Sequence, residues 1–131
     1  MHLPRTIVSL PPGLDVAGAL GQPAATLVRG GPFLFVSGLA AIDPSTGAPL
    51  RGPIMGETRM ILASLRQMLE AAGSSTDKVV KVNILLASML EAVPMNDVYV
   101  QFFADPPPAR TVCGACLPDG CRVMIECTAL A

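Results

Sequence analysis

The spacing of apolar residues along the chain predicts two helices and six strands. Apolar residues recur at intervals of three and four along residues 56–72, which indicates an amphipathic helix that ends before Gly73. A second helix is predicted over residues 91–104, with Pro94 in its first turn and an inner stripe of Val93, Val98, Phe102 and Phe103. Short runs rich in apolar and β-branched residues predict strands at residues 6–10, 24–28, 33–37, 79–86, 112–117 and 121–130.

Turn residues arrange these elements into one α+β domain. Residues 29–32 predict a hairpin turn slightly longer than the tightest class, and residues 118–120 predict a hairpin between the last two strands. The mostly apolar strand 79–86 is expected to be buried on both faces. Segments rich in glycine and proline are expected to be loops, at residues 14–23 and 42–53. The order β-β-β-α-β-α-β-β predicts a mixed sheet with two helices on one face, in a single domain over residues 1–131.

The composition adds an expectation about assembly. Hydrophobic residues make up 51% of the 131 residues and charged residues 15%, so the chain can bury a core and has few charges for its surface. The mean hydropathy is +0.54, yet no apolar run reaches the roughly 18 residues that a membrane span needs. Spare apolar surface favours a homo-oligomer, although a fully buried sheet would give a similar composition.

Charge and targeting patterns narrow the possible partners and the compartment. The net charge is −1, and the nine basic residues are spread along the chain without a run. There is no Trp and only one Tyr, so the basic stripe with stacking aromatic residues that is typical of nucleic-acid binding is missing. The start of the chain lacks the apolar core of a signal peptide, which predicts a cytoplasmic protein with reduced thiols.

The only histidine is His2, and this restricts the possible chemistry. A Ser-His-Asp triad, a Cys-His pair and a histidine-rich metal site are all excluded in the body of the chain. Arg110 is the first candidate ligand contact, because three prolines at 106–108 stiffen its approach. A guanidinium held in this way offers a planar fork to a carboxylate or phosphate. The alternative is a surface arginine paired with a nearby acidic residue.

Four cysteines cluster near the C-terminus, at positions 113, 116, 121 and 127. Their spacing raises the possibility of a zinc site, but Cys113 and Cys116 are three apart in a predicted strand and would point to opposite faces. We therefore expect no metal. The cysteines are interpreted as small buried hydrophobic residues, with a modifiable thiol near Arg110, Cys113 above all, as the alternative.

An ordered set of short motifs resembles the Rid family, also called YjgF, over about residues 14–131. The motifs that carry the resemblance are Phe35-Val36-Ser37-Gly38, Asp43-Pro44, Leu69-Glu70-Ala71-Ala72-Gly73, Val79-Val80-Lys81-Val82, Asn96-Asp97-Val98-Tyr99, Pro108-Ala109-Arg110, Leu117-Pro118 and Ile125-Glu126. The resemblance implies a chorismate-mutase-like fold that assembles as a homotrimer, with clefts between subunits that bind small carboxylic acids. Well-known members hydrolyse enamine and imine intermediates such as 2-aminoacrylate to 2-oxo acids and ammonia, without a cofactor.

The resemblance also assigns roles to individual residues. Arg110 matches the family arginine that holds the substrate carboxylate, Gly38 matches a glycine whose backbone lines the cleft, and Asn96 matches a nearby asparagine. The chain departs from the family at two positions. Leu20 replaces a cleft tyrosine, and Met124 replaces the glutamate linked to the catalytic water, which leaves Glu126 on the same strand face as a partial substitute.

Three functions follow as hypotheses. The first is deamination of 2-imino acids, with Arg110 and Glu126 as catalytic residues and Arg110, Gly38, Asn96, Leu20, Met124 and Cys113 around the substrate. The second is a non-catalytic trimer that binds a carboxylate metabolite, because the cleft is more apolar than in a typical deaminase. The third is the ribonuclease or translation-inhibitor role described for some relatives, against which the acidic pI of 5.7 argues.

Overall fold

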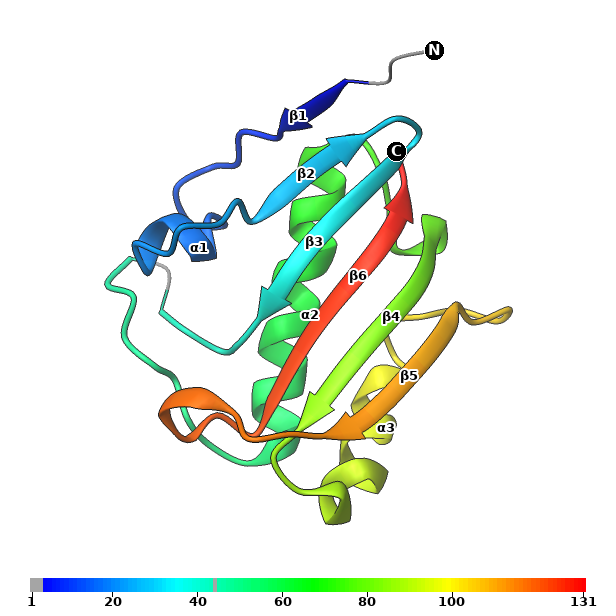
Figure 1. Cartoon of the computed structure of the whole chain (residues 1–131). Coiled ribbons are helices and arrows are strands. Elements are labelled where there is room, and N and C mark those ends of the chain that lie inside the picture. The colour runs from blue at the N-terminus through cyan, green and yellow to red at the C-terminus, as the bar shows by residue number, and fades with distance from the viewer. Residues whose placement is uncertain (1–3, 44) are drawn as a thin grey trace.

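The computed structural model describes residues 4–43 and 45–131, and it has two layers, a mixed six-stranded sheet and two helices that cover one face of it (Figure 1). His2 and Pro44 lie outside the described residues. The strands are β1 (Arg5–Ile7), β2 (Leu27–Gly30), β3 (Phe33–Leu39), β4 (Val79–Leu86), β5 (Ala109–Gly114) and β6 (Val123–Leu130). The covering helices are α2 (Ile54–Ala71) and α3 (Ala92–Tyr99). The α+β class and the mixed sheet predicted from the sequence are therefore confirmed.

The strand order in the sheet is β1-β2-β3-β6-β4-β5, and only β4 and β5 run parallel. The predicted hairpin between β2 and β3 is present, but its turn is shorter than expected. Gly30 pairs with Phe33, so the loop contains only Gly31 and Pro32. Gly31 has a φ of 56°, which glycine adopts without a steric penalty.

The predicted hairpin between the last two strands is wrong. β6 pairs with β3 and β4, and β4 separates it from β5 (Figure 1). α3 connects β4 to β5, which is the crossover that two parallel strands require. Tertiary pairing with β3 and β4 thus overrides the local hairpin signal at residues 118–120, where the chain instead forms a short 3₁₀ turn, η3 (Pro118–Gly120).

The first predicted helix is confirmed and the second is shorter than predicted. α2 buries an apolar stripe, and Gly73 follows it with a φ of 82°. α3 ends at Tyr99, where hydrogen bonds to the residue three positions back replace the helical pattern. The buried side of α3 consists of Met95, Val98 and Tyr99, whereas the predicted inner residue Val93 is 71% exposed.

Residues 14–23, predicted as a loop, contain the short helix α1 (Val16–Ala19). Asp15 caps this helix by accepting a hydrogen bond from the backbone N–H of Gly18 at 3.1 Å. The same carboxylate accepts from the hydroxyl of the buried Thr26 at 2.7 Å, and the Thr26 oxygen accepts from the backbone N–H of Ala17 at 3.0 Å. The hydrogen bonds of Asp15 and Thr26 therefore connect this helix to the segment before β2 and stabilise it. The helix is too short to show a periodic pattern in the sequence.

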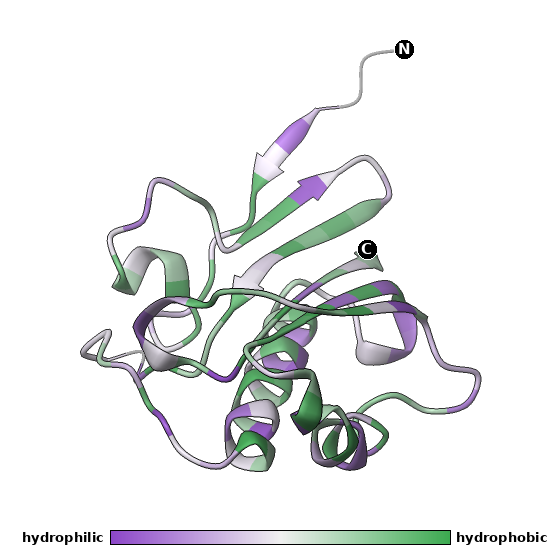
Figure 2. Ribbon diagram, turned by 60° about the horizontal axis from the view of Figure 1, so that its bottom comes forward, coloured by the Kyte–Doolittle hydropathy of each residue, from purple (hydrophilic) through white to green (hydrophobic). Residues whose placement is uncertain are grey.

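The core lies between the sheet and the two helices, and Figure 2 shows apolar residues in both layers. Residues of β4 alternate between buried and partly exposed, so the predicted burial of this strand on both faces does not hold within one chain. The face of the sheet opposite the helices, called the open face below, carries partly exposed apolar side chains at Phe33, Phe35, Val80 and Leu130. No helix in the described residues is both long and apolar enough to cross a bilayer.

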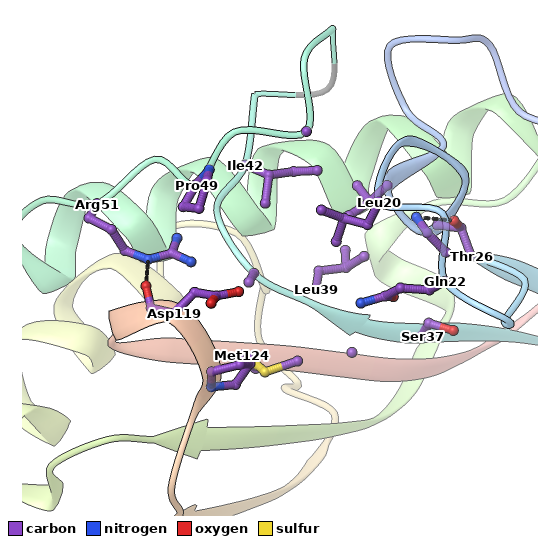
Figure 3. A pocket seen from close by; sticks show the side chains of 16 residues that line it. Leu20, Gln22, Thr26, Ser37, Leu39, Ile42, Pro49, Arg51, Asp119 and Met124 are labelled. Atoms are coloured by element: carbon purple, nitrogen blue, oxygen red, sulfur yellow. Dashed lines mark hydrogen bonds between the residues drawn. The ribbon is translucent and has the colours of Figure 1, made fainter.

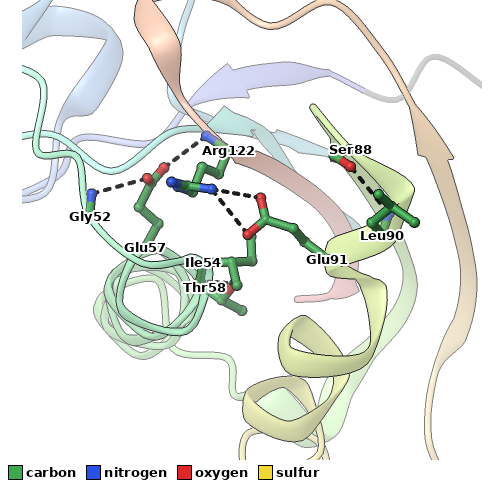
Figure 4. Close-up of polar contacts among 8 residues, drawn as sticks. All are labelled: Gly52, Ile54, Glu57, Thr58, Ser88, Leu90, Glu91 and Arg122. Carbon is green, nitrogen blue, oxygen red and sulfur yellow. Dashed lines mark hydrogen bonds and ion pairs between the residues drawn. The ribbon is translucent and has the colours of Figure 1, made fainter.

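A buried carboxylate joins the start of α2 to two neighbouring segments (Figure 4). Glu57 is only 2% exposed, and it accepts hydrogen bonds from the backbone N–H groups of Gly52 at 3.3 Å and Arg122 at 3.0 Å. The Arg122 guanidinium forms an ion pair with Glu91 at 3.0 Å. Because Arg122 is the second residue after the η3 turn, Glu57 fixes the end of that turn against the helix layer.

Candidate functional site

A pocket of about 270 Å³ lies where the end of β3 meets the start of β6 (Figure 3). Its walls come from α1, the 40–51 loop, the η3 turn and the two strands. The lining residues are Val16, Ala17, Leu20, Gln22, Thr26, Ser37, Gly38, Leu39, Ala40, Ile42, Gly47, Pro49, Arg51, Pro118, Asp119 and Met124. Such a volume suits a small metabolite and is below the size of most drug-binding pockets.

Three of the predicted site residues meet in this pocket. Leu20 ends α1, Gly38 lies near the end of β3, and Met124 is the second residue of β6. A Cβ at Gly38 would come within 3.3 Å of the Met124 Cε, so the absence of a side chain there keeps the pocket open. Leu20 and Met124 contribute apolar side chains to the wall of the pocket.

Two charged residues of the pocket were missed by the sequence analysis. Arg51 and Asp119 stand at one end of the cavity (Figure 3). The Arg51 Nε donates to the carbonyl of Asp119 at 2.9 Å, and its Nη1 donates to the carbonyls of Ala41 at 2.7 Å and Leu50 at 3.1 Å. Arg51 lies in a loop and Asp119 in the three-residue η3 turn, so no periodic pattern could indicate that these distant segments converge here.

Arg110 lies elsewhere, on the side of edge strand β5 that faces α3. Its Nη1 donates to the Oδ1 of Asn96 at 2.6 Å, and its guanidinium carbon lies 4.7 Å from the centre of the Tyr99 ring. Both contacts hold the guanidinium while Arg110 as a whole stays exposed. Burial raises the pKa of Tyr99, and the nearby positive charge of Arg110 opposes that shift. The phenol is therefore neutral and supports the cation with its ring.

Arg110 and the pocket are separated within one chain. Arg110 pairs with Val82 of β4, whereas Met124 pairs with Leu85 of the same strand. Two strand spacings and three residues along a strand correspond to roughly 14 Å between Arg110 and Met124. Arg110 also points to the helix side and Met124 to the open face. One small ligand cannot contact both groups of a single chain.

Glu126 and Cys113 lie on the open face between these two regions. Glu126 is exposed and accepts a hydrogen bond from the Asn83 side chain at 3.0 Å. It shares a strand face with Met124, as predicted, but it does not line the pocket. Cys113 of β5 is exposed and pairs with Leu85, the residue that also pairs with Met124. Both residues are thus available to a group that approaches the open face.

The cysteines do not form a metal centre in the described part of the chain. No group of three or more Cys, His, Asp or Glu side chains there is arranged to hold a metal ion. Cys121 and Cys127 are buried, and burial raises the pKa of Cys127 to about 12. These two behave as small apolar residues, whereas Cys113 and Cys116 are exposed.

Comparison with known proteins shows the family to which this chain belongs. The family model described as endoribonuclease L-PSP matches residues 19–131. The chain belongs to the Rid family. A RutC family protein of Pyrococcus horikoshii is 38% identical over 110 residues, which cover 83% of this chain and 86% of the relative. The resemblance inferred from the sequence motifs is therefore confirmed.

Two other Rid proteins give information about the reactions and ligands found in the family. A mouse protein named 2-iminobutanoate/2-iminopropanoate deaminase is 37% identical over 98 residues, covering 74% of this chain and 73% of its own. The crystal structure of Escherichia coli TdcF with bound serine superposes with a TM-score of 0.74 at 26% identity, covering 83% of this chain and 88% of that one. Members of the family thus include a protein named for imine deamination and one that binds a small amino acid.

Proposed function

We propose that the protein hydrolyses reactive 2-imino acids and their enamine forms to 2-oxo acids and ammonia. The observation that carries this proposal is the fixed, exposed guanidinium of Arg110, which Asn96 and Tyr99 hold in place. Its other N–H groups make no hydrogen bond to the described residues and can bind a carboxylate as a fork. The name of the mouse relative supports the same reaction class.

The site is completed between subunits of a homotrimer. Arg110 lies roughly 14 Å from Met124 of the pocket and points to the other side of the sheet, so a ligand reaches both groups only when a second chain brings its own Arg110 to the pocket. Burial of the partly exposed apolar residues of the open face would favour such an assembly. In this arrangement Gly38 supplies backbone contacts, Leu20 and Met124 form the apolar wall, and Glu126 and Cys113 face the partner.

The reaction suits a site of this composition. An imine carbon is already electrophilic, so attack by water depends on position and orientation more than on a strong base. Arg110 fixes the acid end of the substrate, and the pocket holds the side chain. No cofactor is needed for the addition of water to a C=N bond. We propose that this takes place in the cytoplasm, whereas some relatives are named as mitochondrial or chloroplastic.

The second candidate function is binding of a carboxylate metabolite without turnover. The presence of Met124 on the pocket wall favours it, because a thioether cannot exchange protons with water. The two functions share the Arg110 contact and differ in whether product is released. Saturable binding of a 2-oxo acid without any acceleration of imine hydrolysis would show that the protein binds such a metabolite without converting it.

A coupled assay separates these functions. An amino-acid oxidase, with catalase to remove peroxide, generates 2-imino acids from several amino acids, and 2-oxo acid release is followed with and without the protein. We expect acceleration by the wild type and a loss of about 100-fold or more in Arg110→Ala, because two charge-assisted hydrogen bonds to the substrate disappear.

The matched control is Arg59→Ala, which removes an exposed arginine from α2 and should keep full activity. No acceleration by the wild type with any amino acid would refute the proposed enzyme. Equal activity of Arg110→Ala and wild type would refute the role of Arg110.

A further inference from the structure

One end of the pocket carries a carboxylate and a guanidinium that do not pair with each other. Asp119 and Arg51 both line the cavity, and in the described part of the chain the one ion pair within 4.0 Å joins Arg122 and Glu91 instead. Asp119 is the only Asp or Glu among the lining residues. Its side chain accepts no hydrogen bond from the residues that the structure describes. Asp119 is exposed, so its unpaired carboxylate is available to a ligand that enters the pocket.

The backbone of Asp119 holds this carboxylate in an unusual conformation. Its φ of 55° and ψ of 29° lie in the left-handed region, which costs energy for a residue with a Cβ and is least costly for Asn and Asp. Residues in such conformations concentrate at functional sites. Neighbouring Gly120 also has a positive φ, of 70°. Two positive φ values at an Asp-Gly pair are typical of a type I′ turn, and this turn places the Asp119 side chain at the wall of the pocket.

Arg51 keeps the turn in this position. Its guanidinium donates to the Asp119 carbonyl and also to carbonyls of Ala41 and Leu50, so it ties η3 to the two ends of the 40–51 loop. Glu57 adds a second tether three residues later, at the Arg122 N–H. The backbone of Asp119 thus has a defined place beside the pocket, and its unpaired carboxylate can turn toward a ligand.

We propose that Asp119 is the catalytic carboxylate of this site and that it faces the nitrogen of the bound imino acid. This rests on the proposed function. In the step we assign to it, the oxygen of water forms a bond to the imine carbon as the C=N π electrons move to nitrogen. Asp119 accepts the proton that water loses and returns it to that nitrogen. Asp119 next moves the remaining hydroxyl proton to the nitrogen, so that the C–N bond breaks, ammonia leaves and the C=O bond forms. Substrate and water supply every atom, and no oxidant or further reactant is required.

Asp119→Asn is the most direct test, because asparagine also tolerates the left-handed conformation but cannot accept the proton. In the coupled assay we expect kcat to fall about 100-fold, the lower end of the usual contribution of general acid–base catalysis. KM should change less than kcat, because the imine nitrogen carries no full positive charge, unlike an ammonium group, and the substrate carboxylate is held elsewhere. A fall of less than about threefold would overturn the proposal.

Two further variants guard against a folding defect. Asp119→Gly removes the carboxylate and relieves the backbone cost, so it should fold at least as well as the wild type and lose the same activity. Asp77→Asn is the matched control. Asp77 lies exposed in the 3₁₀ turn η1 (Thr76–Lys78), just before β4 and beside the far end of β6. It should keep full activity.

A binding measurement tests Asp119 without turnover. By calorimetry, we expect the wild type to bind L-2-aminobutyrate at least tenfold more tightly than 2-hydroxybutyrate, because Asp119 faces the ammonium group. Asp119→Asn should remove this preference and leave 2-hydroxybutyrate binding unchanged. An unchanged preference, or none in the wild type, would overturn the inference. If the preference depends on Asp119 but no imine is hydrolysed, the proposed reaction fails and the contact to nitrogen stands.

Discussion

At the scale of single residues, the candidate site depends on how firmly a few polar groups are held. The Arg110 guanidinium lies over the Tyr99 ring and donates one hydrogen bond to the side-chain oxygen of Asn96. Arg51 has three carbonyl partners, and Asp119 has a fixed backbone. Groups held in this way lose little conformational freedom when a ligand binds, which is the basis of preorganisation.

Asn96→Ala tests preorganisation of the Arg110 guanidinium. The variant keeps the arginine and its charge but removes the 2.6 Å hydrogen bond that orients it. We expect the dissociation constant for a 2-oxo acid to rise about tenfold, which corresponds to about 1.4 kcal/mol. Calorimetric titration measures this directly.

The control for this variant comes from the same segment. Gln101→Ala removes an exposed amide that contacts only the backbone carbonyl of Asp97. It should leave the affinity unchanged. Equal affinities for Asn96→Ala and wild type would show that Tyr99 alone fixes Arg110.

Some polar residues of the candidate site could be predicted from the sequence, and others could not. Arg110 and Asn96 could be proposed because they match family motifs, and the apolar replacements Leu20 and Met124 could be located in the pocket in the same way. Arg51 and Asp119 could not, since their meeting depends on carbonyl contacts between distant loops and on one left-handed backbone conformation. Neither the carbonyl contacts nor the left-handed conformation produces a periodic pattern in the sequence.

At the scale of elements, periodicity located the helices and strands well and their pairing less well. α2 and β4 were predicted because each repeats its apolar residues over many positions. The pairing of β5 with β6 was predicted from a turn signal and is wrong, because the insertion of β6 beside β4 depends on packing between distant segments. The short helix α1 was missed because four residues are too few to show a period.

Glu57 gives a prediction about how elements are joined. Glu57→Leu keeps a similar volume but leaves the buried N–H groups of Gly52 and Arg122 without an acceptor. An unsatisfied buried donor costs about 1–3 kcal/mol, so we expect the free energy of unfolding to fall by about 2–4 kcal/mol. Urea unfolding followed by circular dichroism, at equal protein concentration, checks this.

The matched variant on the same helix is Glu70→Leu. Glu70 is exposed, and a surface substitution of this kind usually changes stability by about 0.5 kcal/mol or less. If both variants lose the same stability, the hydrogen bonds of Glu57 do not hold the loops as described.

At the scale of the whole molecule, the two groups that we propose to bind the substrate lie apart on one chain. The pocket with Asp119 opens at one end of the sheet, and Arg110 stands at the β5 edge on the helix side. An open face with partly exposed apolar residues lies between them. These three features are explained together if neighbouring copies of the chain cover the open face and each lends its Arg110 to the pocket of the next.

Subunit complementation tests this account most directly. Arg110→Ala and Gly38→Phe, whose ring would fill the pocket, should each be inactive alone. Mixed trimers, isolated with two different tags, should contain one intact site among three and show about one third of the wild-type rate of imine hydrolysis. Isolated mixed trimers no more active than the two single variants would show that the site does not combine Arg110 of one chain with the pocket of another.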